Sequence, residues 1–204
     1  MKEYSEKALR TRERILDAAG RLFHLNGYNA TGLDKIIAEA GVTKGNFYYH
    51  FETKEALATA TVEWHRRETY RELRLEPTFP GETPLAILFR VLEGMVERTL
   101  RADRNGEIRG CYFGNLALEL SVQSDAVRRA VAAVFDEMRA GFADLLNRAR
   151  ASGEIDATVD PRQSASLILS LMEGAVMMAK TNQTESEARN ALVFIRGWLG
   201  AGTS

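Results

Sequence analysis

The chain has 204 residues, of which 45% are hydrophobic and 27% are charged, and its formal net charge at pH 7 is −1. These values are typical of a folded protein with one or two domains and argue against a disordered chain. A single cysteine excludes an intramolecular disulfide framework, and three scattered histidines lack the spacing of zinc ligands. We therefore expect no metal and no other cofactor, while the near-neutral charge neither favours nor excludes a nucleic-acid partner.

No segment has the properties of a signal peptide or a membrane-spanning helix. The N-terminal stretch MKEYSEKALRTRERIL is rich in charge, and the most apolar run, residues 167–179, is short and interrupted by Glu173. We expect a cytoplasmic protein without a membrane partner. Glu173 shares a helical face with Ser166, Ser170 and Lys180, which favours a solvated or interface position over a counterion for a cationic ligand.

Apolar residues recur at helical spacing along nearly the whole chain, and the period-two alternation typical of strands is absent. Thr83-Pro84 and Asp160-Pro161 each combine a capping side chain with a proline at the first helical position. The predicted helices span residues 6–26, 33–40, 44–51, 54–75, 84–103, 111–121, 124–151, 161–181 and 185–199. The predicted fold class is therefore all-α, with about nine helices. The segment EPTFPGETP, residues 76–84, is dense in proline and glycine and marks a domain boundary.

Two short helices are predicted within LDKIIAEAGVTKGNFYYHF, residues 33–51. An eight-residue helix is not stable alone and needs a partner to pack against. Gly41 can take the left-handed conformation that ends the first helix, and Thr43 can cap the second. The pair therefore forms a helix-turn-helix, in which Phe47 and Phe51 are predicted to face inward.

The opposite face of the second short helix carries side chains suited to DNA. Lys44, Gly45 and Asn46 occupy its first turn, which is the part of a recognition helix that reaches base edges. Three ring residues then offer hydroxyl and imidazole groups to phosphate oxygens, namely Tyr48, Tyr49 and His50. At the start of the next helix, Lys54 adds a positive charge.

An alternative interpretation of the run FYYHF is an aromatic core cluster, because isolated aromatic clusters usually belong to a core. The surrounding sequence favours the DNA-binding interpretation. It contains a capped pair of short helices, a tight glycine turn, a small residue on the outer face and two adjacent tyrosines that cannot both point inward.

Residues 11–57, TRERILDAAGRLFHLNGYNATGLDKIIAEAGVTKGNFYYHFETKEAL, resemble the N-terminal domain of the TetR family of bacterial transcriptional repressors without a gap. The resemblance is carried by R.ILDAA..LF...GY, by Thr31, and by I...AGV.KG..Y.HF..KE.L. Gly32 stands where many members carry a hydroxyl or another small residue. The resemblance implies a helix-turn-helix domain at residues 1–53 and an all-helical effector-binding and dimerisation domain at residues 54–204, with helix 54–75 connecting the two.

The resemblance also implies roles for individual residues. It assigns phosphate contacts to Thr31 and Thr43, base contacts to Lys44 and Gly45, and an anchoring role for the next helix to Lys54. Contacts to the DNA backbone are assigned to the ring residues Tyr48, Tyr49 and His50.

Large apolar residues on the inward stripes of the later helices are candidates for an effector pocket, although each taken alone is more typical of ordinary core. The candidate pocket residues are Trp64, Phe89, Leu92, Cys111, Tyr112, Phe113, Phe135, Met138, Phe142 and Met172. The last two helices carry more apolar surface than a terminal hairpin can bury, so a second copy is expected to cover it as a four-helix bundle. The predicted dimer residues are Leu171, Ala175, Ala188, Leu192, Ile195 and Leu199.

These features predict a dimeric repressor that binds a palindromic operator on double-stranded DNA and is released by an unidentified small-molecule effector. One alternative is a repressor that senses electrophiles or oxidants through Cys111, which follows Gly110 at a predicted helix start and lies near Arg109. A small all-helical enzyme would need a convergent set of titratable groups, which the sequence does not suggest. A helical interaction module would leave the polar face of the second short helix unexplained.

Overall fold

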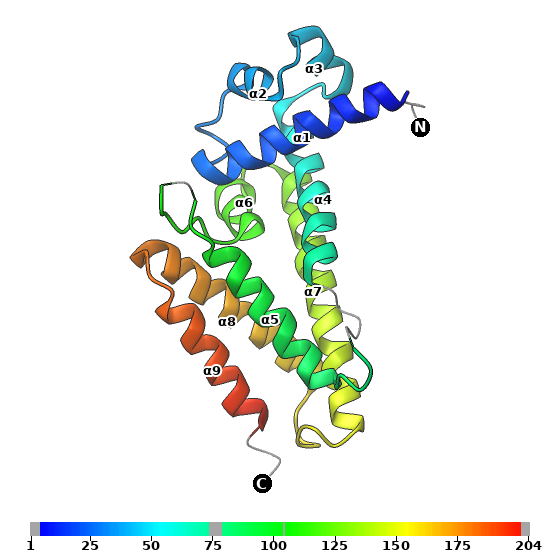
Figure 1. Ribbon diagram of the computed structural model, residues 1–204, viewed down its shortest axis with the longest axis vertical. Coiled ribbons are helices and arrows are strands. Elements are labelled where there is room, and N and C mark those ends of the chain that lie inside the picture. Colours follow the sequence, from blue (N-terminus) through cyan, green and yellow to red (C-terminus); the bar gives the residue numbers. More distant parts are fainter. Residues whose placement is uncertain (1–4, 74–78, 104, 201–204) are drawn as a thin grey trace. The chain divides into compact units, whose positions relative to one another are not determined.

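The computed structural model describes residues 5–73, 79–103 and 105–200, and these ranges contain nine helices and no strand (Figure 1). The helices are α1 (Glu6–Asn26), α2 (Leu33–Ala40), α3 (Lys44–His50), α4 (Lys54–Leu73), α5 (Pro84–Leu100), α6 (Tyr112–Leu120), α7 (Asp125–Ala151), α8 (Pro161–Asn182) and α9 (Ser186–Gly200). The predicted all-α fold class is confirmed. No helix within these ranges is long and apolar enough to cross a membrane.

The chain packs as two compact units. The N-terminal unit consists of Met1–Glu68 and Asn115–Ala132, and the C-terminal unit consists of Thr69–Gly114 and Ala133–Ser204. Helices α4, α6 and α7 contribute residues to both units. This division follows packing, and the functional boundary expected after residue 53 stays a prediction. Part of the segment predicted to mark a domain boundary, residues 76–78, lies outside the described residues.

Helix starts and stops in the N-terminal unit follow from local side-chain chemistry. Ser5 caps α1 by accepting a hydrogen bond from the Ala8 amide at 3.3 Å. Gly27 ends α1 with a φ of 82°, a conformation that favours glycine. The core side chains of α1, among them Ile15 and Phe23, are almost completely buried in the unit that contains α2 and α3. The short helices are thus supported by the longer α1.

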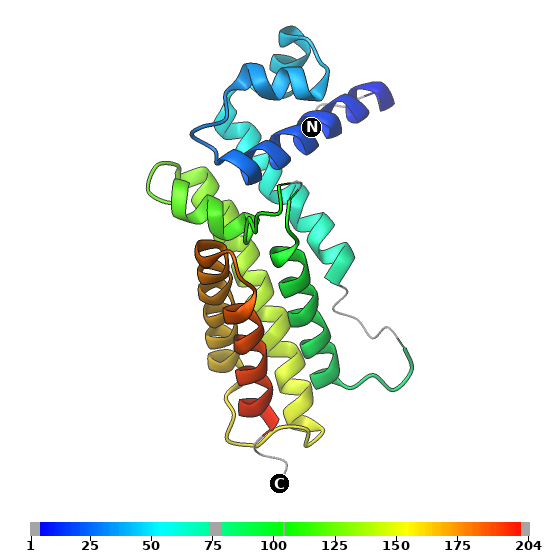
Figure 2. The same ribbon diagram turned by 60° about the vertical axis from the view of Figure 1, so that its left-hand side comes forward.

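In the C-terminal unit, α8 and α9 form an adjacent pair with α5 beside them (Figures 1 and 2). Thr83 caps α5 and Asp160 caps α8, each followed by a proline at the first helical position, as predicted. Gln183 ends α8 in the left-handed conformation with a φ of 52°. Its side chain bonds to the Ile108 backbone at 2.8 and 3.1 Å, which compensates for that conformation.

Most predicted helix limits agree with the structure within one residue. The prediction for residues 84–103 is wrong at its end, because α5 stops at Leu100. The Asp103 carboxylate accepts the amides of Asn105 and Glu107 at 2.8 and 3.0 Å, and such local bonds compete with a helix. The last two residues of the predicted helix 54–75 lie outside the described residues.

Candidate DNA-binding face, ligand region and dimer face

The turn between α2 and α3 is fixed by backbone and side-chain hydrogen bonds. Gly41 is left-handed, with φ 61° and ψ 42°, and its amide bonds to Ala38 O at 3.1 Å while the Val42 amide bonds to Ile37 O at 3.2 Å. This pair of bonds is the Schellman arrangement. Thr43 then starts α3 by accepting the Asn46 amide at 3.2 Å. The predicted helix-turn-helix is confirmed.

Arg14 of α1 is a supporting residue that the sequence prediction missed. Its guanidinium donates to Ala40 O at 3.1 Å and to Gly41 O at 2.6 Å, which are carbonyls left without partners at the end of α2. Arg14 therefore ties the turn to the first helix. In the sequence, Arg14 is only an arginine at the edge of the apolar stripe of α1. Its position does not indicate that it binds the turn after α2.

The aromatic residues of α3 and of its C-cap, Phe51, divide between the two sides of the helix. Phe47 and Phe51 are buried, whereas Tyr48 and Tyr49 are 45% and 50% exposed. His50 is half-buried, and its ring centroid lies 4.9 Å from that of Tyr49. The core-cluster alternative therefore accounts for the two phenylalanines but not for the tyrosines.

The first turn of α3 is open. Lys44, Gly45 and Asn46 are exposed, as is Thr43. A Cβ atom built at Gly45 would meet nothing within 4 Å, so the packing of this chain does not require glycine there. A glycine at an open position lets another molecule approach the backbone closely.

The structure corrects one predicted phosphate contact. Thr31 is fully buried, and its hydroxyl donates to Leu22 O at 3.2 Å and to Gly27 O at 2.7 Å. A buried hydroxyl with these partners is not available to a phosphate, so the structure contradicts a phosphate contact through the Thr31 side chain. Lys54 Nζ donates to Tyr28 O at 2.6 Å and lies 4.1 Å from the Tyr28 ring centroid, which supports the anchoring role that the resemblance implies. A contact between Lys54 and DNA stays a prediction.

Two of the predicted pocket residues line the same small cavity. Met138 and Phe142 do meet, together with Val91 and Met95, around a cavity of about 10 Å³. That volume holds one water molecule at most. The structure therefore has no room for an effector at this point without a movement of the surrounding helices.

The other predicted pocket residues are distributed through the two units. Leu92, Tyr112, Phe113 and Met172 are buried in the C-terminal unit. Phe89 and Phe135 are half-buried in that unit, where the Arg196 guanidinium lies 4.4 Å from the Phe89 ring centroid. Trp64 belongs to the N-terminal unit. The effector site thus stays a prediction for the whole set.

Cys111 lies at the N-terminus of α6, where its Sγ accepts a hydrogen bond from the Gly114 amide at 3.4 Å. Burial raises the pKa of the Cys111 thiol well above its usual value, and the charge of Glu173 raises it further. Arg109 does not offset this, because its guanidinium binds Asp103 at 2.6 Å and also Glu107. The surroundings contradict the expectation of a stabilised thiolate.

Glu173 is also placed differently from the prediction. Its carboxyl group shares a hydrogen bond with Cys111, and desolvation raises its pKa. A Cβ atom at Gly114 would lie 2.6 Å from Glu173 Oε2, so glycine is needed for this close contact. Glu173 therefore joins α8 to α6 within the protomer rather than pointing into solvent.

The structure also corrects the predicted dimer face. Ala188, Ile195 and Leu199 are almost completely buried within the protomer, where α9 packs against α5 and α8, and Leu192 and Ala175 are less than 10% exposed. Of the predicted residues only Leu171 is substantially exposed. The large exposed apolar residues of this helix pair are Leu167, Leu171, Met177, Met178, Val193 and Phe194.

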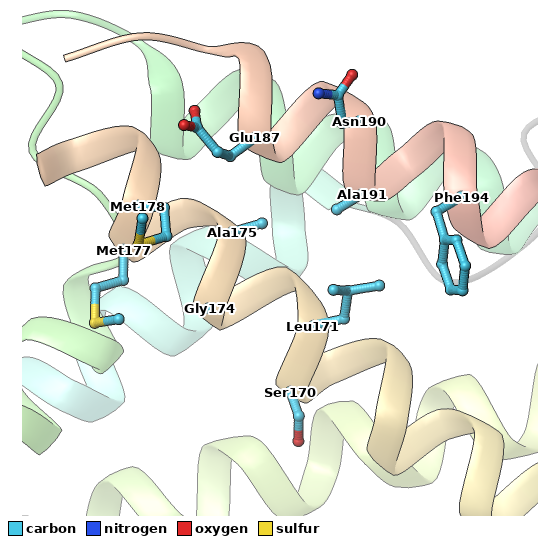
Figure 3. A pocket seen from close by; sticks show the side chains of 10 residues that line it. All are labelled: Ser170, Leu171, Gly174, Ala175, Met177, Met178, Glu187, Asn190, Ala191 and Phe194. Atoms are coloured by element: carbon cyan, nitrogen blue, oxygen red, sulfur yellow. The ribbon is translucent and has the colours of Figure 1, made fainter. Parts of the chain in front are cut away.

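A groove of about 570 Å³ runs between α8 and α9 on this exposed side. Figure 3 shows Leu171, Met178 and Phe194 around small residues, including Ala175 and Ala191. The groove is almost entirely apolar, with Ser170, Glu187 and Asn190 as its polar members. We call this surface the α8–α9 groove.

A short helix that presents a polar first turn and two exposed tyrosines, held by a tight turn on two other helices, defines a helix-turn-helix DNA-binding protein. Two family models match the chain and make the class specific. "Bacterial regulatory proteins, tetR family" matches residues 15–61, and "Tetracyclin repressor-like, C-terminal domain" matches residues 89–195. The chain belongs to the TetR family of transcriptional regulators.

Curated relatives support this assignment. The transcriptional regulator AcuR of Cereibacter sphaeroides is 35% identical over 156 residues, which cover 76% of this chain and 69% of that protein. The regulator LmrA of Bacillus subtilis is 30% identical and covers 84% of this chain and 87% of its own length. The repressor NemR of Escherichia coli K12 is 28% identical, with 91% and 92% covered.

Solved structures give the same fold. A TetR transcriptional regulator from Chloroflexus aurantiacus superposes with a TM-score of 0.84 at 30% identity and covers 95% of this chain and 96% of that one. A TetR regulatory protein from Rhodobacter sphaeroides gives a TM-score of 0.77 at 28% identity, with 93% and 97% covered.

Proposed function

We propose that this protein is a ligand-responsive transcriptional repressor that binds a palindromic operator as a homodimer. The observation that carries the proposal is the open first turn of α3, where Lys44, Gly45 and Asn46 are exposed beside Tyr48 and Tyr49. Phe47 and Phe51 face the core, whereas this polar side faces outward, where a partner can reach it.

The contacts to DNA divide by chemistry. Lys44 and Asn46 carry donors that can reach base edges in the major groove, and Gly45 lets the backbone approach closely. Tyr48 and Tyr49 place hydroxyl donors beside the phosphates, which position the protein without reading sequence. The first group determines which operator is bound, whereas the second determines how tightly any duplex is bound.

A second copy of the chain covers the α8–α9 groove in this proposal. Leu171, Met178 and Phe194 are 38%, 44% and 63% exposed, and such grouped apolar side chains are typical of an interface. The small residues between them let the two helix pairs approach closely. A two-fold arrangement of four helices would present two copies of α3 to successive major grooves.

The effector would bind in the C-terminal unit and weaken operator binding. An effector that bound between Met138 and Phe142, where the cavity is about 10 Å³, would bind a form in which the surrounding helices are farther apart. Operator and effector must then weaken each other's binding by the same factor. This reciprocity holds whatever the chemical nature of the effector.

The test is selection of duplexes from a random pool with the wild-type protein. We expect enriched duplexes that contain two inverted half-sites, and a loss of enrichment for Lys44→Ala and Asn46→Ala. Arg162→Ala, which removes an exposed charge from α8, serves as the control and should select the same duplexes. A wild-type protein that enriches no duplex would contradict the proposed function.

A further inference from the structure

The connection between α1 and α2, residues 27–32, is held by a carboxylate from much later in the chain. Glu119 Oε2 accepts the Tyr28 amide at 2.8 Å, and Glu119 Oε1 accepts the Asn29 amide at 2.6 Å. Each carboxylate oxygen therefore binds one backbone donor. A Cβ atom at Gly27 would lie 3.2 Å from Glu119 Oε2, so the glycine also makes room for the carboxylate.

Other side chains of the N-terminal unit bind the same connection. Lys54 donates to Tyr28 O at 2.6 Å, and its ammonium interacts electrostatically with the Glu119 carboxylate. The buried Thr31 hydroxyl holds the last turn of α1 through Leu22 O and Gly27 O. Thr31 belongs to the connection itself and Lys54 comes 26 residues after Tyr28, whereas Glu119 of α6 comes 91 residues after it.

The segment that follows α6 makes a second contact of this kind. Ser124 donates to the Glu55 carboxylate in the first turn of α4. Its Oγ also accepts the Val127 amide at 3.1 Å and so caps α7. Glu119 near the end of α6 and Ser124 just before α7 therefore bind the α1–α2 connection and the start of α4, which precede and follow the helix-turn-helix in the chain.

The position of α2 depends strongly on residues 27–32. Helix α2 has only eight residues, and Gly32 at its N-cap provides no side-chain hydrogen bond. Such a helix is marginal without external contacts. Its other end is joined to α3 by the Schellman turn that Arg14 supports. A displacement of the connection is therefore passed to α2 and from there to α3.

We propose that Glu119 is a positioning residue for operator binding, which presupposes the DNA-binding function proposed above. Its carboxylate fixes the connection between α1 and α2 and thereby sets the orientation of α3. Helix α6, which carries Glu119, begins in the C-terminal unit, where Cys111 at its N-terminus contacts Glu173 of α8.

The decisive variant is Glu119→Gln, which keeps the shape of the side chain. One amide oxygen can still accept a backbone donor, but the NH₂ group must face the second backbone N–H. Because bonds to a charged acceptor are stronger than neutral ones, we expect operator affinity to fall about tenfold. Backbone amide exchange at Tyr28 and Asn29 should become faster, while exchange in α5 and α8 should not change.

Glu82→Gln is the matched control. Glu82 is a buried carboxylate that pairs with Arg90 at 2.7 Å within the C-terminal unit. We expect this variant to lower the melting temperature while leaving operator affinity unchanged when it is measured well below the transition. If both variants weakened operator binding equally, the effect of Glu119 would be one of general stability and the proposal would be wrong.

Amide exchange separates this proposal from the proposed function. If the exchange of Tyr28 and Asn29 is unaltered in Glu119→Gln, the carboxylate does not hold the connection, whatever the protein binds. Faster exchange with unchanged operator affinity would also overturn the positioning role. A wild-type protein that binds no operator would contradict the proposed function and with it this role, yet the exchange experiment would still report on the contact.

Discussion

Tyr49 on α3 and Phe194 on α9 are rings of similar size with similar exposure, 50% and 63%. Their neighbourhoods differ. Tyr49 lies beside lysine, asparagine and histidine and ends in a hydroxyl that water can solvate. Phe194 lies beside leucine, methionine and alanine at the edge of the α8–α9 groove. An exposed ring with a polar end can remain in water, whereas a group of apolar side chains is usually covered by a partner.

The helices behind these rings differ in a second way. Helix α3 packs within the N-terminal unit through Phe47, and through Phe51 just after its end, and its other side is polar, so its inward and outward sides differ in chemistry. Helix α9 is apolar on both sides, because Ile195 is 1% exposed and Phe194 beside it is largely exposed. The inward and outward sides of α3 can therefore be told apart by their residue types. Both sides of α9 are apolar, so only the structure shows which side is buried.

The largest expected effect comes from adding a charge to the inward side of α9. Ile195→Arg would bury a guanidinium without a partner at a cost of several kcal/mol, which is comparable with the total stability of many domains. We expect little folded protein by circular dichroism. Phe194→Arg places the same charge on the groove edge, and we expect a folded protein that sediments as a monomer.

This pair of variants tests the assignment of the two sides of α9 directly. If Ile195→Arg were a folded monomer and Phe194→Arg remained a dimer, the inward and outward sides would have to be exchanged. If Phe194→Arg were a dimer of wild-type stability, the α8–α9 groove would not be the dimer face.

The next effect concerns the inward side of α3. Phe47 is fully buried, and loss of a core phenylalanine to alanine costs about 3 to 5 kcal/mol. We expect Phe47→Ala to unfold the N-terminal unit at much lower urea concentration than the wild type requires. Tyr49→Phe is the control on the outward side and should leave the urea midpoint nearly unchanged. Equal losses in the two variants would contradict the division of α3 into two faces.

A smaller effect separates the two kinds of DNA contact on α3. Lys44→Ala and Tyr49→Phe should each weaken operator binding by about 1 kcal/mol, or roughly fivefold. Lys44→Ala should also relax the preference for operator over unrelated duplex, because it removes a contact to a base. Tyr49→Phe should weaken both duplexes alike. Fluorescence anisotropy titrations of the two duplexes at one salt concentration measure this difference, and an unchanged preference in Lys44→Ala would argue against base contact.

Much of the fold could be predicted from the sequence because its signals are local. Apolar spacing, caps such as Thr83 and Asp160, and the Gly41 turn each act within a few residues, and the helices they predict are present. The end of α5 was missed because Asp103 bonds to amides beyond the helix. In the sequence, an aspartate that ends a helix in this way is hard to distinguish from an ordinary acidic residue within a helix.

The DNA-binding face could be predicted better than the dimer face, because only the former depends on local sequence signals. Tyr48 and Tyr49 could be placed outside because the buried positions of the same helix were identifiable. Thr31 and Glu119 could not be placed, since their partners lie in backbone that is positioned by the tertiary fold. Ile195 was wrongly placed in the dimer face, because a wide apolar stripe does not indicate which of its residues pack against the protomer's own core.

The smallest expected effect concerns Cys111 and the carboxyl group beside it. Burial and the Glu173 charge raise the pKa of the Cys111 thiol, so its thiolate fraction near pH 7 to 8 is below that of an unperturbed cysteine. Since the thiolate is the nucleophile, a maleimide should alkylate Cys111 more slowly than it alkylates a small thiol. Glu173→Gln removes the negative charge, lowers the thiol pKa and should speed alkylation at every pH below that pKa.

The same alkylation rates also show whether Cys111 is an unreactive buried thiol or a thiol that could sense electrophiles. The rate should rise with pH through the range in which the thiolate forms, and the whole curve should lie at lower pH in Glu173→Gln than in the wild type. Glu107→Gln is a suitable control, because it removes a nearby negative charge that pairs with Arg109 rather than with the thiol, so it should leave the curve unchanged. If the wild-type thiol reacted faster than a small thiol at pH 7, Cys111 would be an activated nucleophile, and its contact with Glu173 would have to open in solution.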